Sequence, residues 1–126
     1  MTPVAAIAQS GIAAATLKLN ASASNTVNAN DRSALGASGY QPLAVDNSAL
    51  PTGGVLAQAV TLKPGTMVVY DPTSSAANAR GLADAPEIDP VNEMSNTLAA
   101  GRAFAFSVKV LKAADGEDKT LLDMKT

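Results

Sequence analysis

The residues best suited to acid–base chemistry are clustered near the end of the chain. They are four carboxylates, Asp115, Glu117, Asp118 and Asp123. A carboxyl group acts as a general acid near neutral pH only when burial or a like charge raises its pKa. Lysines at positions 112, 119 and 125 alternate with these carboxylates, and the pattern supplies no burial that would raise a pKa. We therefore interpret the cluster as a solvated, charge-balanced helix face without catalytic residues.

Two shorter groups carry oxygen ligands of the kind that calcium prefers. They are Asp71 with Thr73 and Ser74, and Asp84 with Glu87. A calcium-binding loop needs alternating oxygen ligands and a glycine at its sharp turn, and neither group has them. The glycines of PTGGVL (51–56) and KPGT (63–66) lack the spacing and the Lys-Ser/Thr ending of a phosphate-binding loop. DPTSS (71–75) and the two glycine-containing segments are therefore predicted to be turns, and no metal or cofactor site is expected in any of the four.

The composition removes most of the usual participants in catalysis and in recognition of charged polymers. The chain contains no His and no Cys, which are the commonest general base and the soft metal ligand. With 9 Lys and Arg against 11 Asp and Glu, the formal charge is −2, so no basic field attracts nucleic acid or an anionic membrane. Arg102 and Phe104 are interpreted as an exposed charge beside a packed ring. We expect no enzymatic activity, no nucleic-acid partner and no small-molecule substrate.

The chain is also poor in large apolar side chains. Its 126 residues suit one domain, but aromatic residues make up only 3% and alanine supplies much of the 47% apolar fraction. Because alanine buries little area, and burial contributes ~25 cal/mol per Å², a self-contained core is thin. The stretch VAAIAQSGIAAATLKL (4–19) has no positive charge ahead of it and is too polar and short to span a bilayer. We interpret it as mature, soluble structure.

Helical periodicity is present near both ends of the chain. The N-terminal stripe follows a spacing of three and four residues through Val4, Ala8, Ile12, Ala15 and Leu19. Alanine favours this helix, and the Asn- and Ser-rich stretch 20–30 should end it, because these side chains compete for backbone hydrogen bonds. In the second helix Asp89 is a good N-cap and Pro90 suits the first helical position.

The second helix carries the strongest periodic signal in the sequence. Its apolar stripe consists of Val91, Met94, Leu98, Gly101, Ala105 and Val108, widened by Phe104 and Leu111. We expect this stripe to pack on the N-terminal helix and on neighbouring molecules. A second, heptad-like spacing in the N-terminal helix runs through Val4, Ile7, Gly11, Ala14 or Ala15 and Lys18. The small residues Gly11 and Ala15 of this helix and Gly101 and Ala105 of the second helix should let the helix axes approach closely.

Between the helices the sequence predicts only small elements. Residues 36–54 look like a loop, and residues 55–62 and 67–70 look like two short strands around a Pro-Gly turn. Residues 73–88 show no sustained period. Two amphipathic helices, a thin core and no site are best explained if the apolar stripes are buried against another copy or a close relative.

Four stretches resemble the axial proteins of the bacterial flagellum, which include the basal-body rod proteins. They are SGIAAATLKLNASASNTVNAN (10–30), SGYQPLAV (38–45), VVYDPTSSAANARGLADAP (68–86) and IDPVNEMSNTLAAGRAFAFSVKVLKAADG (88–116). Residues 23–29 are similar to the Ala-Ser-Asn-Leu-Ala-Asn-Ala signature of that family, with Thr26 and Val27 in place of its leucine-alanine step. The last stretch resembles a Val-Glu-Glu-Met signature followed by Arg-Ala-Tyr, with Phe104 in place of the tyrosine.

The resemblance implies a mainly α fold with a small β segment. Terminal helices would pair as a coiled-coil-like hairpin, forming an inner domain from residues 1–30 and 88–126, with residues 31–87 as a central loop and β-hairpin region. It implies a structural rod subunit, most like those of the proximal rod, that polymerises helically with itself and other rod proteins. Such proteins enclose an export channel, transmit torque, lie in the periplasmic part of the basal body, and leave through the flagellar type III export apparatus without a cleaved signal peptide.

The apolar stripes and the family resemblance both place an assembly interface on the terminal helices. The residues expected there are Val4, Ile7, Gly11, Ala15, Leu19, Ser24, Asn25, Asn28, Val91, Met94, Leu98, Gly101, Arg102, Phe104, Ala105, Val108 and Leu111. The main alternative is a small helical-hairpin adaptor, monomeric or dimeric, that docks on another protein. An adaptor should stay folded and soluble at high concentration, whereas a rod subunit should be disordered or polymerise.

Overall fold

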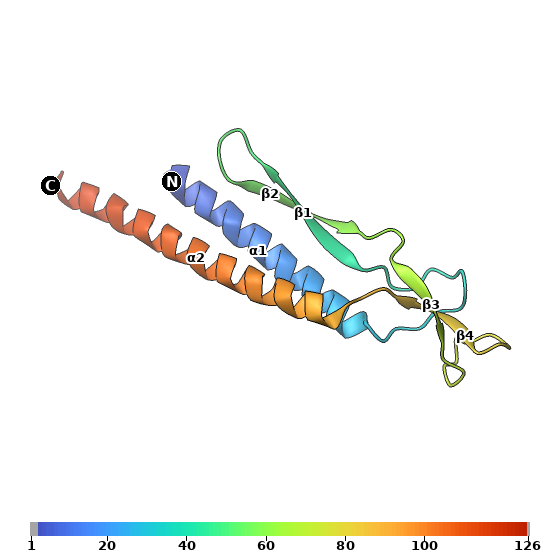
Figure 1. The fold of residues 1–126 in the computed structure, drawn as a ribbon. Coiled ribbons are helices and arrows are strands. Elements are labelled where there is room, and N and C mark those ends of the chain that lie inside the picture. The colour runs from blue at the N-terminus through green and yellow to red at the C-terminus, as the bar shows by residue number, and fades with distance from the viewer. Residues whose placement is uncertain (1–2, 126) are drawn as a thin grey trace.

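The computed structural model in Figure 1 describes residues 3–125 as two long helices with two small β-hairpins between them in sequence. The elements in chain order are α1 (Pro3–Asn28), β1 (Leu43–Ala49), β2 (Val55–Thr61), β3 (Thr66–Tyr70), β4 (Leu82–Pro86) and α2 (Pro90–Asp123). The predicted fold class, mainly helical with a small β segment, is confirmed. Neither helix is long and apolar enough, within the described residues, to cross a membrane.

The boundaries of both helices follow local signals. The N-cap side chain of Asp89 accepts a hydrogen bond from the Val91 amide (2.9 Å), Pro90 occupies the first helical position, and Glu93 adds a negative charge to the first turn. As predicted, α1 ends within the Asn- and Ser-rich stretch, at Asn28. The helix α2 continues through Gly116 without a break.

The strands form two separate two-stranded antiparallel sheets. The pairs are β1 with β2, where Leu43 lies opposite Thr61, and β3 with β4, where Thr66 lies opposite Pro86. The strands expected at 55–62 and 67–70 are present, but the prediction that they form one hairpin is wrong, and β1 and β4 lie in segments expected to be irregular. Turn residues explain part of the difference, because Gly53 and Gly54 both have positive φ and form the turn between β1 and β2.

The two helices are antiparallel and pack through small side chains. Gly11 faces Ser107, and Asn25 bonds to Glu93 near the other end of α1. Apart from Pro42 and Pro86, the apolar side chains buried among the described residues are alanines: Ala5, Ala8, Ala14, Ala15, Ala21, Ala83, Ala85, Ala100 and Ala114. The β1–β2 hairpin runs along α1, while the β3–β4 hairpin lies beyond the end of the helix pair (Figure 1). The two helices are therefore held together by the close approach of small side chains rather than by a core of large ones.

The apolar stripe of α2 does not face α1, which corrects the sequence-based prediction. Val91, Met94 and Leu98 are 72%, 67% and 54% exposed, and a side chain at Gly101 would meet no described atom within 4 Å. The face that packs on α1 includes Glu93, Asn96, Ala100, Ser107 and Ala114. At about 100° per residue, the stripe is centred roughly 150° away from that face. Gly11 and Ala15 do lie against α2, whereas Gly101 and Ala105 point outward.

The C-terminal end of α2 extends past the first described residue of α1. In the antiparallel register set by Gly11 with Ser107, Pro3 lies level with about Asp115. The helix continues to Asp123, and Figure 1 shows this end projecting beyond the start of α1. Leu121 and Leu122 are therefore 64% and 66% exposed.

Candidate assembly interface

A buried asparagine joins α1, β1 and α2 at the base of the helix pair. Asn25 is only 1% exposed. Its Nδ2 donates to the Leu43 carbonyl and to Glu93 Oε1, both at 2.9 Å. Its Oδ1 accepts from the Leu43 amide (2.8 Å) and from the Tyr40 hydroxyl (2.9 Å). Both donors and both acceptor positions of the amide are thus used, so a buried polar group is fully satisfied.

Tyr40 extends this network to a second residue of α1. Its hydroxyl lies 2.9 Å from both Asn25 Oδ1 and Ser24 Oγ. Because Oδ1 can only accept, Tyr40 donates to it, and the Ser24 hydroxyl donates to Tyr40. The nearby Asn28 instead donates to the Ser24 carbonyl of its own helix (2.8 Å). Asn25, but not Asn28, therefore connects the two terminal helices.

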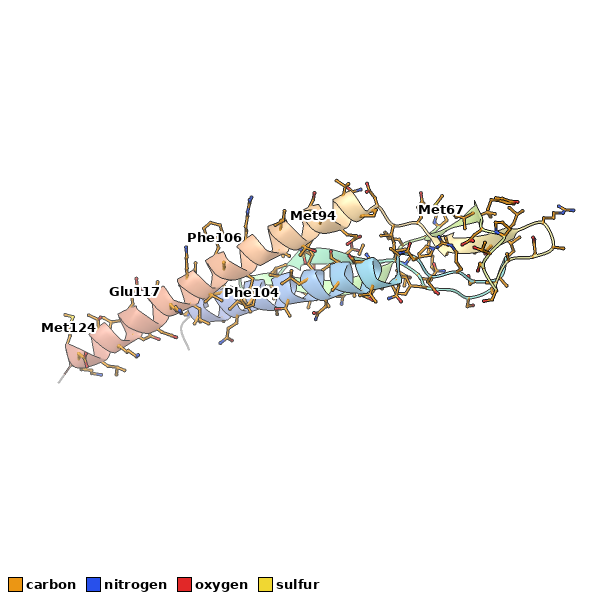
Figure 2. All side chains as sticks on the ribbon, turned by 90° about the horizontal axis from the view of Figure 1, so that it is seen from below. Met67, Met94, Phe104, Phe106, Glu117 and Met124 are labelled. Atoms are coloured by element: carbon orange, nitrogen blue, oxygen red, sulfur yellow. The ribbon has the colours of Figure 1, made fainter. Side chains whose placement is uncertain are left out.

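The outward side of α2 is an exposed apolar surface. We define the outer face of α2 as Val91, Met94, Leu98, Gly101, Ala105 and Val108. Figure 2 shows Met94 projecting from α2 on the side away from α1. Since Val91, Met94 and Leu98 on this face are more than half exposed, the outer face has the character of an interaction surface.

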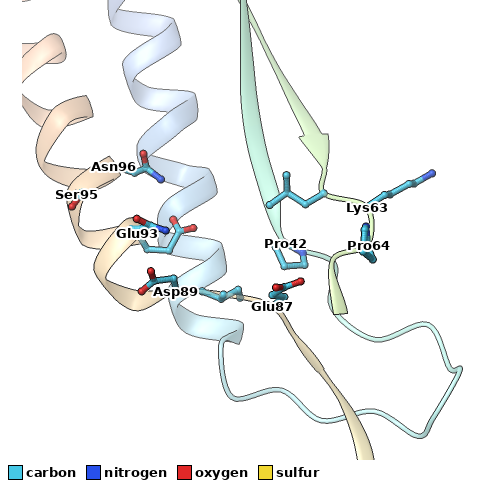
Figure 3. Close-up of a pocket in the computed structure, with 11 residues that line it drawn as sticks. Pro42, Lys63, Pro64, Glu87, Asp89, Glu93, Ser95 and Asn96 are labelled. Carbon is cyan, nitrogen blue, oxygen red and sulfur yellow. The ribbon is translucent and has the colours of Figure 1, made fainter. Parts of the chain in front are cut away.

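Several hollows lie along α2, on the side that faces the β1–β2 hairpin. Near the start of α1, a mainly apolar hollow of about 420 Å³ is lined by Val4, Ile7, Val55, Phe106 and Val110. At the start of α2, a hollow of about 520 Å³ is lined by Pro42, Lys63 and several residues of α2 and its preceding loop (Figure 3). These hollows offer further surface for packing between molecules.

The carboxylates weighed as calcium ligands are used to hold loops instead. Asp71 Oδ1 accepts from the Thr73 hydroxyl (2.8 Å), and Asp71 Oδ2 lies 3.3 Å from Arg32 Nε. The hydroxyl bond, together with the guanidinium charge, holds the pKa of Asp71 below its usual range. Asp84 Oδ2 accepts from the Gly36 amide (2.7 Å). Within residues 3–125 no group of three acidic side chains is arranged to hold a metal ion.

Comparison with known proteins gives the family. The family described as "Flagellar basal body rod FlgEFG protein C-terminal" matches residues 84–124. The flagellar basal-body rod protein FlgC of Salmonella typhimurium is 34% identical over 111 residues, covering 83% of each chain. The chain belongs to the flagellar basal-body rod protein family. Its FlgC relative in Buchnera aphidicola is 38% identical over 63 residues, 49% of this chain and 46% of that protein.

Membership in the rod protein family gives the function in outline. The chain is a structural component of the rod in the flagellar basal body. The Asn25–Glu93 hydrogen bond joins the two segments of the rod protein that resemble the N- and C-terminal signatures of flagellar axial proteins.

The residues expected at the interface occupy three kinds of environment. Two of them are buried, Ala15 and Asn25. Six are half-buried: Gly11, Leu19, Ser24, Asn28, Val108 and Leu111. The other nine are exposed: Val4, Ile7, Val91, Met94, Leu98, Gly101, Arg102, Phe104 and Ala105. Phe104, expected to be a packed ring, is 38% exposed. Sequence reasoning missed Tyr40, Leu43, Glu93 and Ser107 as packing partners. Tyr40 and Leu43 lie in the SGYQPLAV stretch (38–45), and Glu93 and Ser107 lie in the stretch 88–116. The family resemblance of these stretches is the signal that could have pointed to them.

Proposed function

We propose that this rod protein polymerises helically with copies of itself and with other rod proteins to form the proximal rod. In that assembly residues 1–30 and 88–126 form the inner domain around the export channel, residues 31–87 form a smaller outer segment, and the polymer transmits torque. The protein has no enzymatic role. The observation that carries the proposal is the outer face of α2, whose apolar residues point away from the partner helix.

Energetics favour burial of that face between subunits. Fully burying a side chain such as Val91, Met94 or Leu98 contributes about 1.5–3 kcal/mol each. By contrast, the apolar residues buried among the described residues are mainly alanines, which contribute little area. Each subunit therefore gains a large part of its apolar burial only on assembly, as in obligate oligomers.

The dilute subunit should accordingly be weakly ordered. Circular dichroism and amide exchange on dilute protein are expected to show weak helix and little protection over residues 4–29 and 90–125. Most helical stability comes from tertiary packing, and the hydrophobic side chains buried within the subunit are alanines, which bury little area. Protection should rise in assembled rods. Strong protection of both segments in the dilute subunit would instead support the helical-hairpin adaptor.

The N-terminal segment is proposed to serve export through the flagellar type III apparatus, without cleavage, as well as assembly. Removing residues 1–29 deletes α1 together with Asn25, and so leaves α2 without its helical partner. We expect the truncated protein to be expressed but neither secreted nor incorporated, by immunoblot of cell and secreted fractions and by electron microscopy of basal bodies. The full-length Arg80→Ala variant, altered at an exposed loop position, is the control. Normal motility and intact basal bodies with the truncation alone would contradict the rod role proposed.

A further inference from the structure

The hollow at the start of α2 is acidic. Three carboxylates line it, from Glu87, Asp89 and Glu93, against the single cation Lys63. Figure 3 shows the Lys63 side chain extending away from these carboxylates. Glu93 Oε1 is bonded to Asn25, but the buried Oε2 has no hydrogen-bond partner among the described residues. None of the three carboxylates forms an ion pair with a described residue. The hollow therefore presents uncompensated negative charge.

Cations lie beside the outer face of α2 and give this part of the helix the opposite charge. Between residues 90 and 114 the only acidic residue is Glu93, which faces α1, whereas Arg102, Lys109 and Lys112 point outward. Lys109 lies over the Phe106 ring of its own helix, 5.9 Å from its centroid. Arg102 has no ion pair or hydrogen bond with any described residue and lies beside Gly101. An exposed guanidinium group thus lies at the edge of the outer face, next to a glycine with open space around it.

We propose that the outer face of α2 in one copy docks on the acidic hollow of a second copy, with Arg102 placed between Glu87 and Asp89. A guanidinium group suits two carboxylates because its planar donors bond to both at once. Charge complementarity selects this occupant, since the charged groups beside the outer face are cations and the hollow is rich in carboxylates. The inference rests on the proposed function, in which copies of the chain associate.

The two surfaces have no residue in common, so one copy can use both. Within α2 the hollow is lined by Asn92, Ser95 and Asn96, whereas the outer face begins with Val91 and Met94. The contact joins unlike surfaces and is therefore heterologous, which lets it repeat from copy to copy along an open helical array.

Charge reversal tests the contact in the purified full-length chain. Sedimentation at increasing concentration should show that Arg102→Glu and Glu87→Arg each raise the concentration needed for self-association at least tenfold, because a salt bridge becomes a like-charge contact. The Glu87 side chain has no hydrogen bond to a described residue, and both positions are exposed, so helix content should not change. Arg80→Glu, the same reversal at an exposed loop position outside both surfaces, should have no effect.

Mixing the two single variants tests the pairing of residues 102 and 87 more directly than either variant alone. An equimolar mixture of Arg102→Glu and Glu87→Arg should associate nearly as well as wild type, because each residue at position 102 then meets a residue of opposite charge at position 87. The chain carrying both substitutions should also recover. If neither the mixture nor the double variant recovers, or if wild type does not self-associate, the proposed contact is wrong.

The same variants in cells separate this inference from the proposed function. If wild type and Arg102→Glu are incorporated equally well into basal bodies, the contact is wrong while the rod role stands. If wild-type protein itself is not incorporated, the proposed function fails. Incorporation of wild type with loss in Arg102→Glu, restored by Glu87→Arg in the same chain, supports both.

Discussion

Replacing Asn25 with leucine should reduce completed basal bodies at least tenfold. Asn25 is 1% exposed and its amide makes four hydrogen bonds, to Tyr40, Glu93 and both backbone groups of Leu43. Leucine has a similar size but leaves these groups without partners. Each buried polar group left unpaired costs about 1–3 kcal/mol, and ~1.4 kcal/mol already changes an equilibrium tenfold. Basal bodies are counted by electron microscopy at matched expression.

Asn28→Leu provides the matched control for Asn25→Leu. It makes the same substitution three residues later in α1, but the Asn28 side chain bonds only to the Ser24 carbonyl of its own helix. We expect at most a small loss of assembly from that variant. Equal effects at both positions would show that the network around Asn25 does not hold the helices together.

Asn25→Asp separates hydrogen bonding from volume. This change keeps the shape of the side chain but removes its two donors and places a carboxylate against Glu93 Oε1, where the present bond is 2.9 Å. Assembly should fail as it does in Asn25→Leu. Adding Glu93→Gln to the same chain supplies an amide donor and removes the like charge, so assembly should partly recover.

Gly101→Leu should impair assembly strongly while leaving the subunit intact. A side chain at Gly101 meets no described atom within 4 Å, so the subunit accepts it. Leucine is also a better helix former than glycine by about 1 kcal/mol, and helix content of the dilute subunit should stay equal or rise. In the polymer, overpacking a close contact costs roughly 1–3 kcal/mol, and every subunit repeats that cost. Circular dichroism and counts of completed basal bodies measure the two effects.

Substitutions at two further glycines separate effects on the outer face of α2 from effects on packing within the subunit. At Gly11 an added Cβ would lie 2.6 Å from Ser107 Oγ, so Gly11→Leu should wedge α1 from α2 and impair assembly by disturbing the helix pair rather than the outer face. At Gly116, an added Cβ again meets no described atom, and the flanking Lys112 and Lys119 are polar. Gly116→Leu should therefore raise helix propensity without blocking assembly. If Gly101→Leu assembles as well as wild type, close packing on the outer face of α2 is wrong.

The sequence alone determined the elements whose causes are local. Asp89 and Pro90 define the start of α2, because capping and a fixed φ act within one turn. Asn and Ser side chains end α1 at Asn28, and the apolar runs at 55–62 and 67–70 form strands. The exposed apolar surface was also predictable, since the spacing from Val91 to Val108 marks one face of a helix whatever that face contacts.

Only the tertiary structure decided which surfaces meet. The helix α1 packs against Ala100 and Ser107 rather than against the apolar stripe, because small side chains let the two backbones approach and leave the larger residues outside. Periodicity measures where apolar residues lie on a helix and contains no information about the neighbour. Likewise, β2 pairs with β1 and not with β3, and Asn25 meets Glu93 across 68 positions. Such contacts depend on chain segments that are distant in sequence, so no local pattern specifies them.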